Sequence, residues 1–164
     1  MGLSEFIQAN QEAILGAFEA YVLSHVPPGV DLTRAEARDQ AGQVLAEIAE
    51  VMRHRSLPPD DVPAQEHGSA RHAEGFDVKH VLGEYRMLRG TIMRMWLASR
   101  PSLGTAGVED LVRFNEAIDH AVDSSVSQFE AEVRRVGTSD SSSGSAAATR
   151  RTTHPSAGKR KHSE

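Results

Sequence analysis

The chain alternates between amphipathic segments with helical spacing and short stretches that contain proline or glycine. Within each segment, apolar residues recur three and four positions apart, which places them on one face of an α-helix. The pattern predicts five helices, at about residues 4–25, 33–52, 63–74, 77–99 and 107–136. No segment is a convincing strand. Because the connections are short and each helix has one apolar face, we expect an all-α fold packed as an antiparallel bundle.

Several helix ends carry recognisable signals. Thr33 and Glu36 have the spacing of a capping box, in which each side chain bonds the backbone of the other. Gly75 is placed to end the third helix, and Asp77 is placed to cap the start of the fourth. These signals fix the order of the elements more firmly than the hydrophobic pattern alone.

The helical pattern stops at Gly137. Residues 137–164 are rich in Ser, Thr, Ala and Gly, and such a segment buries too little apolar area to offset its ordering entropy. We therefore expect a helical domain at 1–136 and a disordered, weakly basic tail at 137–164. The first part holds 21 acidic and 13 basic side chains, and the second holds 2 acidic and 5 basic. An acidic body makes nucleic-acid binding unfavourable.

Three polar residues fall on the apolar stripes of the two longest predicted helices. Arg89 lies on the stripe of the fourth helix, and Asn115 and Asp119 lie on that of the fifth. A guanidinium stays charged, so on a buried face it needs a carboxylate, a carbonyl or water. We expect Arg89, Asn115 and Asp119 to form a buried polar layer. Its role is an ion pair that fixes helix register, a buried switch pair, or a small polar pocket for an anionic ligand.

Catalytic and metal-binding patterns find little support. His67 and His72 are five residues apart, which is poor spacing for shared metal ligation, whereas His67 and Arg71 share a helix face. Glu84 lies one position off the apolar stripe and is expected to be a solvated helix-edge residue. The chain shows no glycine-rich phosphate loop and no nucleophile elbow. We assign no catalytic residue, no metal ligand and no cofactor.

The absence of cysteine excludes disulfides, thiolate metal sites and a cysteine nucleophile, and it fits a cytoplasmic protein. No apolar run approaches the roughly 20 residues that span a bilayer, and no secretory signal is visible. We therefore expect no membrane partner.

An ordered series of residues resembles the N-terminal sensory domain of the RsbR-type and RsbRD-type co-antagonists of the stressosome. The series covers residues 3–135 and includes His67, Gly68, Arg71, Gly75, Phe76, Glu84, Tyr85, Arg86 and Trp96. Later stretches, at 114–119 and 125–129, resemble the last helix of that domain. The same helical domain heads many bacterial sensor histidine kinases.

The resemblance implies a globin-like or bundle-type α domain that lacks haem, a homodimer, and signal input through a protein partner rather than catalysis. In that family the last helix continues into a transmitter or a phosphorylatable domain. Here residues 137–164 contain neither a kinase phospho-acceptor box nor an ATP-binding segment. Two alternatives therefore stay open, a truncated input module of a sensor histidine kinase and a haem-binding or metal-binding protein of globin descent.

Overall fold

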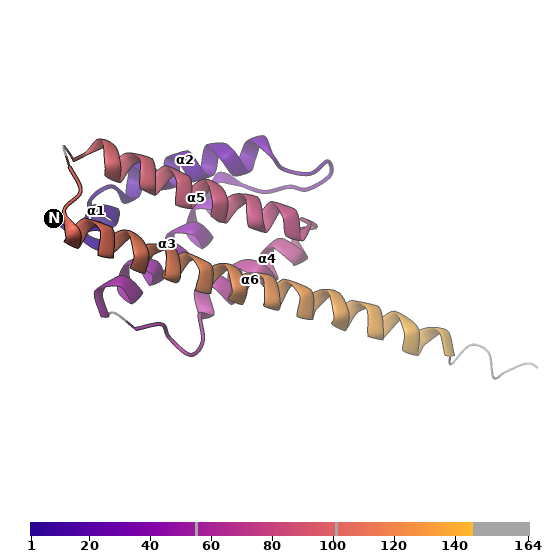
Figure 1. The fold of residues 1–164 in the computed structure, drawn as a ribbon. Coiled ribbons are helices and arrows are strands. Elements are labelled where there is room, and N and C mark those ends of the chain that lie inside the picture. Colours follow the sequence, from indigo (N-terminus) through magenta and orange to yellow (C-terminus); the bar gives the residue numbers. More distant parts are fainter. Residues whose placement is uncertain (55, 101, 146–164) are drawn as a thin grey trace, which may run out of the picture. The chain divides into compact units, whose positions relative to one another are not determined.

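The structure is a computed structural model that describes residues 1–54, 56–100 and 102–145, with side chains placed as far as residue 138. Within these ranges the secondary structure is entirely helical (Figure 1). The helices are α1 (Leu3–Ala9), α2 (Gln11–Ser24), α3 (Arg34–His54), α4 (Val62–Ala73), α5 (Val78–Ala98) and α6 (Thr105–Ser145). The chain divides into two compact units, Met1–Val133 and Arg134–Glu164, and the core and the candidate site lie in the first. The expected all-α class is confirmed.

Six helices stand where five are predicted, because the first predicted helix is broken at Asn10. The Asn10 side-chain amide donates to the Phe6 carbonyl oxygen at 2.8 Å, and its backbone N–H reaches the same oxygen at 3.0 Å. An asparagine that bonds a nearby backbone carbonyl offers the chain an alternative to continued helix. The result is a short α1 followed by α2, which begins at the next residue.

The predicted helix ends are present in the structure. The Thr33 backbone N–H donates to Glu36 at 2.9 Å, and the Glu36 N–H donates back to the Thr33 hydroxyl at 3.2 Å, which completes the capping box. Asp77 accepts from the His80 N–H at 3.0 Å at the start of α5. Gly75 has a φ of 88° just after α4, a left-handed conformation that glycine adopts without strain.

The last helix extends beyond its predicted end. The sequence pattern predicts that the helix stops before Gly137, but α6 continues to Ser145. The apolar stripe that predicts a helix ends near residue 136, whereas the backbone hydrogen bonds of a helix need no apolar stripe to continue. The rest of the expected disordered tail, residues 146–164, lies outside the described residues.

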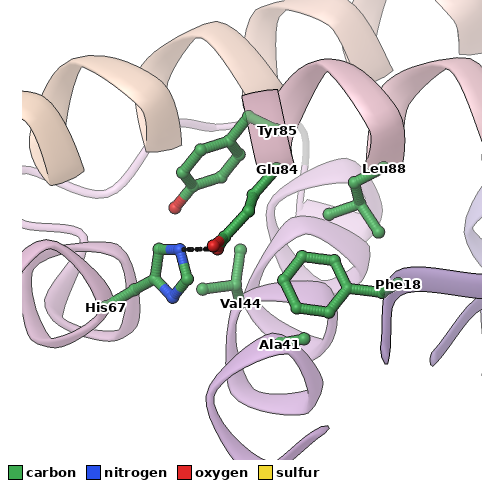
Figure 2. Close-up of a pocket in the computed structure, with 7 residues that line it drawn as sticks. All are labelled: Phe18, Ala41, Val44, His67, Glu84, Tyr85 and Leu88. Atoms are coloured by element: carbon green, nitrogen blue, oxygen red, sulfur yellow. Dashed lines mark ion pairs between the residues drawn. The ribbon is translucent and has the colours of Figure 1, made fainter. Parts of the chain in front are cut away.

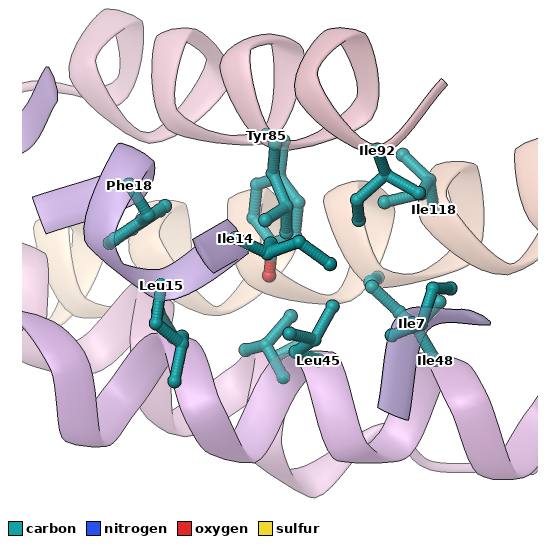
Figure 3. Close-up of a cluster of buried hydrophobic side chains, with 14 of the residues drawn as sticks. Ile7, Ile14, Leu15, Phe18, Leu45, Ile48, Tyr85, Ile92 and Ile118 are labelled. Atoms are coloured by element: carbon teal, nitrogen blue, oxygen red, sulfur yellow. The ribbon is translucent and has the colours of Figure 1, made fainter. Parts of the chain in front are cut away.

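The core of the first unit lies between all six helices. Helix α2 packs on α3 and α5, α1 packs on α3, and α4 packs on both α3 and α5. Helices α5 and α6 run antiparallel, since Arg89 meets Asp119 while the earlier Tyr85 interacts with the later Ser125. Figure 3 shows branched aliphatic side chains filling the centre, among them Ile7, Ile14, Leu15, Leu45, Ile48, Ile92 and Ile118.

Candidate functional site

A buried carboxylate forms the centre of the most unusual site in the first unit. The Glu84 side chain points inward from α5, and only 2% of the residue's surface is exposed. Its Oε1 accepts a hydrogen bond from Nε of Arg71 at 2.9 Å, and its Oε2 lies 2.9 Å from Nε2 of His67 (Figure 2). Both partners belong to α4 and are also buried. The expectation that Glu84 is solvated is therefore wrong.

Arg71 extends this contact into a network across three helices. Its Nη1 donates to Oε1 of Gln40 on α3 at 2.9 Å and to Oε2 of Glu74 at 2.7 Å. Gln40 in turn donates to Glu74 at 3.1 Å. The turn that begins at Gly75 places the Phe76 ring against the guanidinium, whose central carbon lies 5.0 Å from the ring centroid. We call the set His67, Arg71, Glu74, Glu84 and Gln40 the buried network.

The electrostatics of the network favour an ionised Glu84. Burial alone would raise the pKa of its carboxyl group, but the hydrogen bond from His67 and the charge of Arg71 outweigh burial, and the pKa is lowered. Burial raises the pKa of the neighbouring Tyr85 hydroxyl, an effect that Ser125 only partly offsets. At neutral pH the site therefore holds a carboxylate beside a neutral phenol.

A cavity of about 10 Å³ adjoins the network and is lined by Phe18, Ala41, Val44, Leu88 and the network residues His67 and Glu84, with Tyr85. Figure 2 shows the apolar side chains closing it on the sides of α2 and α3. This space suits about one water molecule, whereas small-molecule sites occupy about 300–1,000 Å³. A haem does not fit beside His67, whose Nε2 is already engaged by Glu84.

The structure corrects the expected polar layer of Arg89, Asn115 and Asp119. Arg89 and Asp119 do form an ion pair between α5 and α6, but their side chains are 33% and 67% exposed. Asn115 donates to the Leu111 carbonyl oxygen of its own helix at 2.8 Å and is half-buried. Arg89 and Asn115 are thus half-buried and Asp119 is exposed, so the three residues do not form a buried layer.

The stripes that carry these residues contribute to a partly exposed apolar face. On α6, Val108 and Val112 precede Asp119 by eleven and seven residues, spacings that place all three near one helix face, and both valines are exposed. On α5, Leu82 and Leu97 are exposed near the line of Arg89. We call this surface, formed by Leu82, Arg89, Leu97, Val108, Val112 and Asp119, the α5–α6 face.

The remaining residues of the resemblance fall into separate places. Trp96 is buried. The Phe6 ring meets it edge-on at 5.2 Å between centroids, and the central carbon of the Arg100 guanidinium lies 3.5 Å from the centroid of the Trp96 ring. Arg86 is exposed and lies outside the network. Gly68 was not singled out as a site residue, although a Cβ added there would stand 2.1 Å from the Ser125 carbonyl oxygen. The only sequence signal for this close contact is that Gly68 directly follows His67.

The described residues contain neither a metal-binding cluster nor a membrane-spanning helix. No group of three or more His, Cys, Asp or Glu side chains among them is arranged to hold a metal ion. Across the same part of the chain, every helix is too short or too polar to cross a bilayer.

Comparison with known proteins identifies one family. The family model described as the N-terminal domain of the RsbT co-antagonist protein RsbRD matches residues 12–143. No curated protein matches the chain. No solved structure matches it either.

Proposed function

The chain belongs to the family of RsbT co-antagonist RsbRD N-terminal domains, and we propose that it is a sensory or regulatory domain of bacterial signal transduction. It acts in the cytoplasm by binding other proteins and performs no catalysis of its own. The match over residues 12–143 is the observation that carries this proposal, because it spans most of the helical unit. The closed site around Glu84 supports it, since the adjoining cavity of about 10 Å³ leaves no room for a substrate.

The surface proposed for protein contact is the α5–α6 face. Its valines and leucines are about 37–53% exposed, and the face also holds a cation and an anion that already pair with each other. We infer that a second copy of the chain covers this face. A two-fold dimer places the same patch against itself, and a patch with one arginine and one aspartate is self-complementary in charge. Burying its apolar rim then supplies the association energy.

The oligomeric state tests this surface directly. We expect the full chain to sediment as a dimer and Val112→Glu to shift it toward monomer, because a carboxylate would be buried without a partner. Val62→Glu is the matched control, since Val62 is 52% exposed and Val112 is 53% exposed, and Val62 lies on α4 and is not part of the α5–α6 face. Equal sedimentation of the wild-type protein and Val112→Glu would contradict the dimer.

Measuring the binding of partner proteins tests the regulatory role. Affinity capture with the full chain as bait is followed by calorimetry with each captured protein after purification, and with the RsbT homologue of the same cell. We expect saturable binding to a signalling protein by the wild-type chain and by Val62→Glu. If no purified signalling protein binds either of them, the proposed function is wrong.

A further inference from the structure

Helix α4 contacts the buried network and α6 at adjacent positions. His67 and Arg71 of α4 hold Glu84 of α5. Between these two residues, Gly68 lies so close to α6 that an added Cβ would stand 2.1 Å from the carbonyl oxygen and 2.9 Å from the carbonyl carbon of Ser125. Both atoms belong to backbone, so the two helices touch without intervening side chains. At this point α4 cannot move closer to α6 without displacing it.

Polar and aromatic contacts continue this junction along α6. Gln128 donates to the Ser69 hydroxyl at 3.1 Å, and Ser69 donates to Glu132 at 3.3 Å. The His72 ring meets the Phe129 ring edge-on at 5.2 Å. Helix α4 is thus attached to α6 over more than one turn on the side that includes Gly68, Ser69 and His72.

We propose that α4 is a mechanical coupler, in which the buried network sets the position of α4 and α4 sets the packing of α6 over residues 121–132. The helix has only 12 residues and moves as a rigid body. A change in the bonds of Arg71 therefore displaces Gly68, and the displacement reaches α6 through backbone contact. Glu74 bonds Arg71 of α4 and Gln40 of α3, so a change at Glu74 reaches α6 through α4. Glu84 lies on α5, which also meets α6 directly through Tyr85 and Arg89.

The coupling goes beyond the proposed function and does not depend on it. It is a property of the folded chain and can be measured without any partner. A chain that binds no signalling protein can still show the coupling, and a regulatory domain can lack it.

Hydrogen exchange of the full chain tests the coupler. Glu84→Gln removes the central charge, and Glu74→Gln removes the half-buried partner of Arg71 with less risk to folding. In both variants we expect amides at 121–132 to exchange at least tenfold faster while those of α2 keep the wild-type rate. Arg34→Gln is the control, because it breaks only an exposed ion pair with Glu19 and leaves α6 exchange unchanged.

The reverse direction provides a second measurement, because coupling between two sites is reciprocal. Gly68→Ala forces the two backbones apart, and Ser69→Ala removes only the side-chain contact should the first variant fail to fold. We expect either change to shift the NMR signal of the Arg71 side-chain N–H. Gly16→Ala serves as the control, since an added Cβ there has nothing within 4 Å.

Two results would overturn the proposal. In the first, Glu84→Gln and Glu74→Gln fold and speed exchange in α4 and α5 while α6 keeps the wild-type rate. In the second, exchange rises equally in all helices, α2 included, which indicates global destabilisation rather than transmission through α4.

Discussion

The carboxylate of Glu84 is stable inside the protein because its oxygens receive hydrogen bonds from two buried side chains. A lone ionised carboxylate in an apolar interior is strongly unfavourable, and a partner repays the desolvation only when the geometry is good. Arg71 supplies a charged donor at 2.9 Å and 3.1 Å to the two oxygens, and His67 lies 2.9 Å from the second. The site is therefore sensitive to the loss of either partner.

Replacing Arg71 by methionine is expected to destabilise the fold strongly. The change keeps much of the side-chain volume but leaves Glu84 ionised with only His67 for a partner. Removing one member of a buried ion pair costs about 3–5 kcal/mol. Urea unfolding followed by circular dichroism measures this loss, with Arg34→Met as a control that breaks a surface pair and leaves the midpoint unchanged. A midpoint for Arg71→Met equal to that of the control would contradict the assigned role.

The sequence predicts part of this site. It places His67 and Arg71 on one helix face, and the structure confirms this, because a spacing of four residues fixes a shared direction. It predicts that Glu84 is solvated, which is wrong because α5 packs against α1, α2 and α4, so that more of its circumference is buried than the apolar stripe alone. Arg89 and Asp119 are the opposite case, because the pattern predicts that they are buried and the structure leaves them 33% and 67% exposed. Periodicity tells which residues share a face, but it does not tell whether another helix covers that face.

At the scale of elements, local signals were the most informative. The capping box at Thr33 and the caps around Gly75 and Asp77 form in the structure because each depends on atoms within a few residues. The pattern does not predict the break at Asn10, since an asparagine inside an apolar helical pattern carries no spacing signal. The extension of α6 to Ser145 was missed for a related reason, namely that hydrophobic pattern measures packing rather than helix length.

Gly75 offers an element-scale prediction. Its φ of 88° is unfavourable for any residue with a Cβ, so Gly75→Ala is expected to destabilise the protein by about 1 kcal/mol. Gly16→Ala inside α2 is the control and is expected to stabilise by about 0.5–1 kcal/mol, because alanine favours helix and the added Cβ meets nothing within 4 Å. Thermal unfolding compares the two. A higher melting temperature for Gly75→Ala than for wild type would contradict the strained turn.

For the molecule as a whole, buried carboxylates contribute to stability with opposite signs. The pKa of Glu84 is lowered by His67 and Arg71, so this group stabilises the folded state when ionised. Asp61, which caps α4 by accepting from the Ala64 N–H at 3.1 Å, behaves differently. Burial raises its pKa, and the hydrogen bond and the charge of His120 do not compensate. Ionised Asp61 therefore opposes folding at neutral pH.

Because Glu84 and Asp61 contribute to stability with opposite signs, replacing each one should change the free energy of unfolding in opposite directions at neutral pH. The native pKa of Glu84 lies below its unfolded value of about 4.3, so its contribution is present above that pH and is lost as the pH falls through the native pKa. Glu84→Gln should be less stable than wild type at pH 7, and the gap should narrow below about pH 4.3. Urea titrations from pH 7 to pH 3 measure the gap. A gap that stays constant would mean that the pKa of Glu84 is the same in the folded and unfolded states, which contradicts the lowered pKa.

Asp61→Asn completes the comparison, because asparagine also caps helices well but carries no charge. The native pKa of Asp61 lies above its unfolded value of about 3.9, so the unfavourable contribution is present above the native pKa and disappears as the pH falls toward 3.9. Asp61→Asn should therefore be more stable than wild type at pH 7, and this gain should vanish near pH 4. A loss of stability at pH 7 would show that the charge of Asp61 at the N-terminus of α4 outweighs its burial.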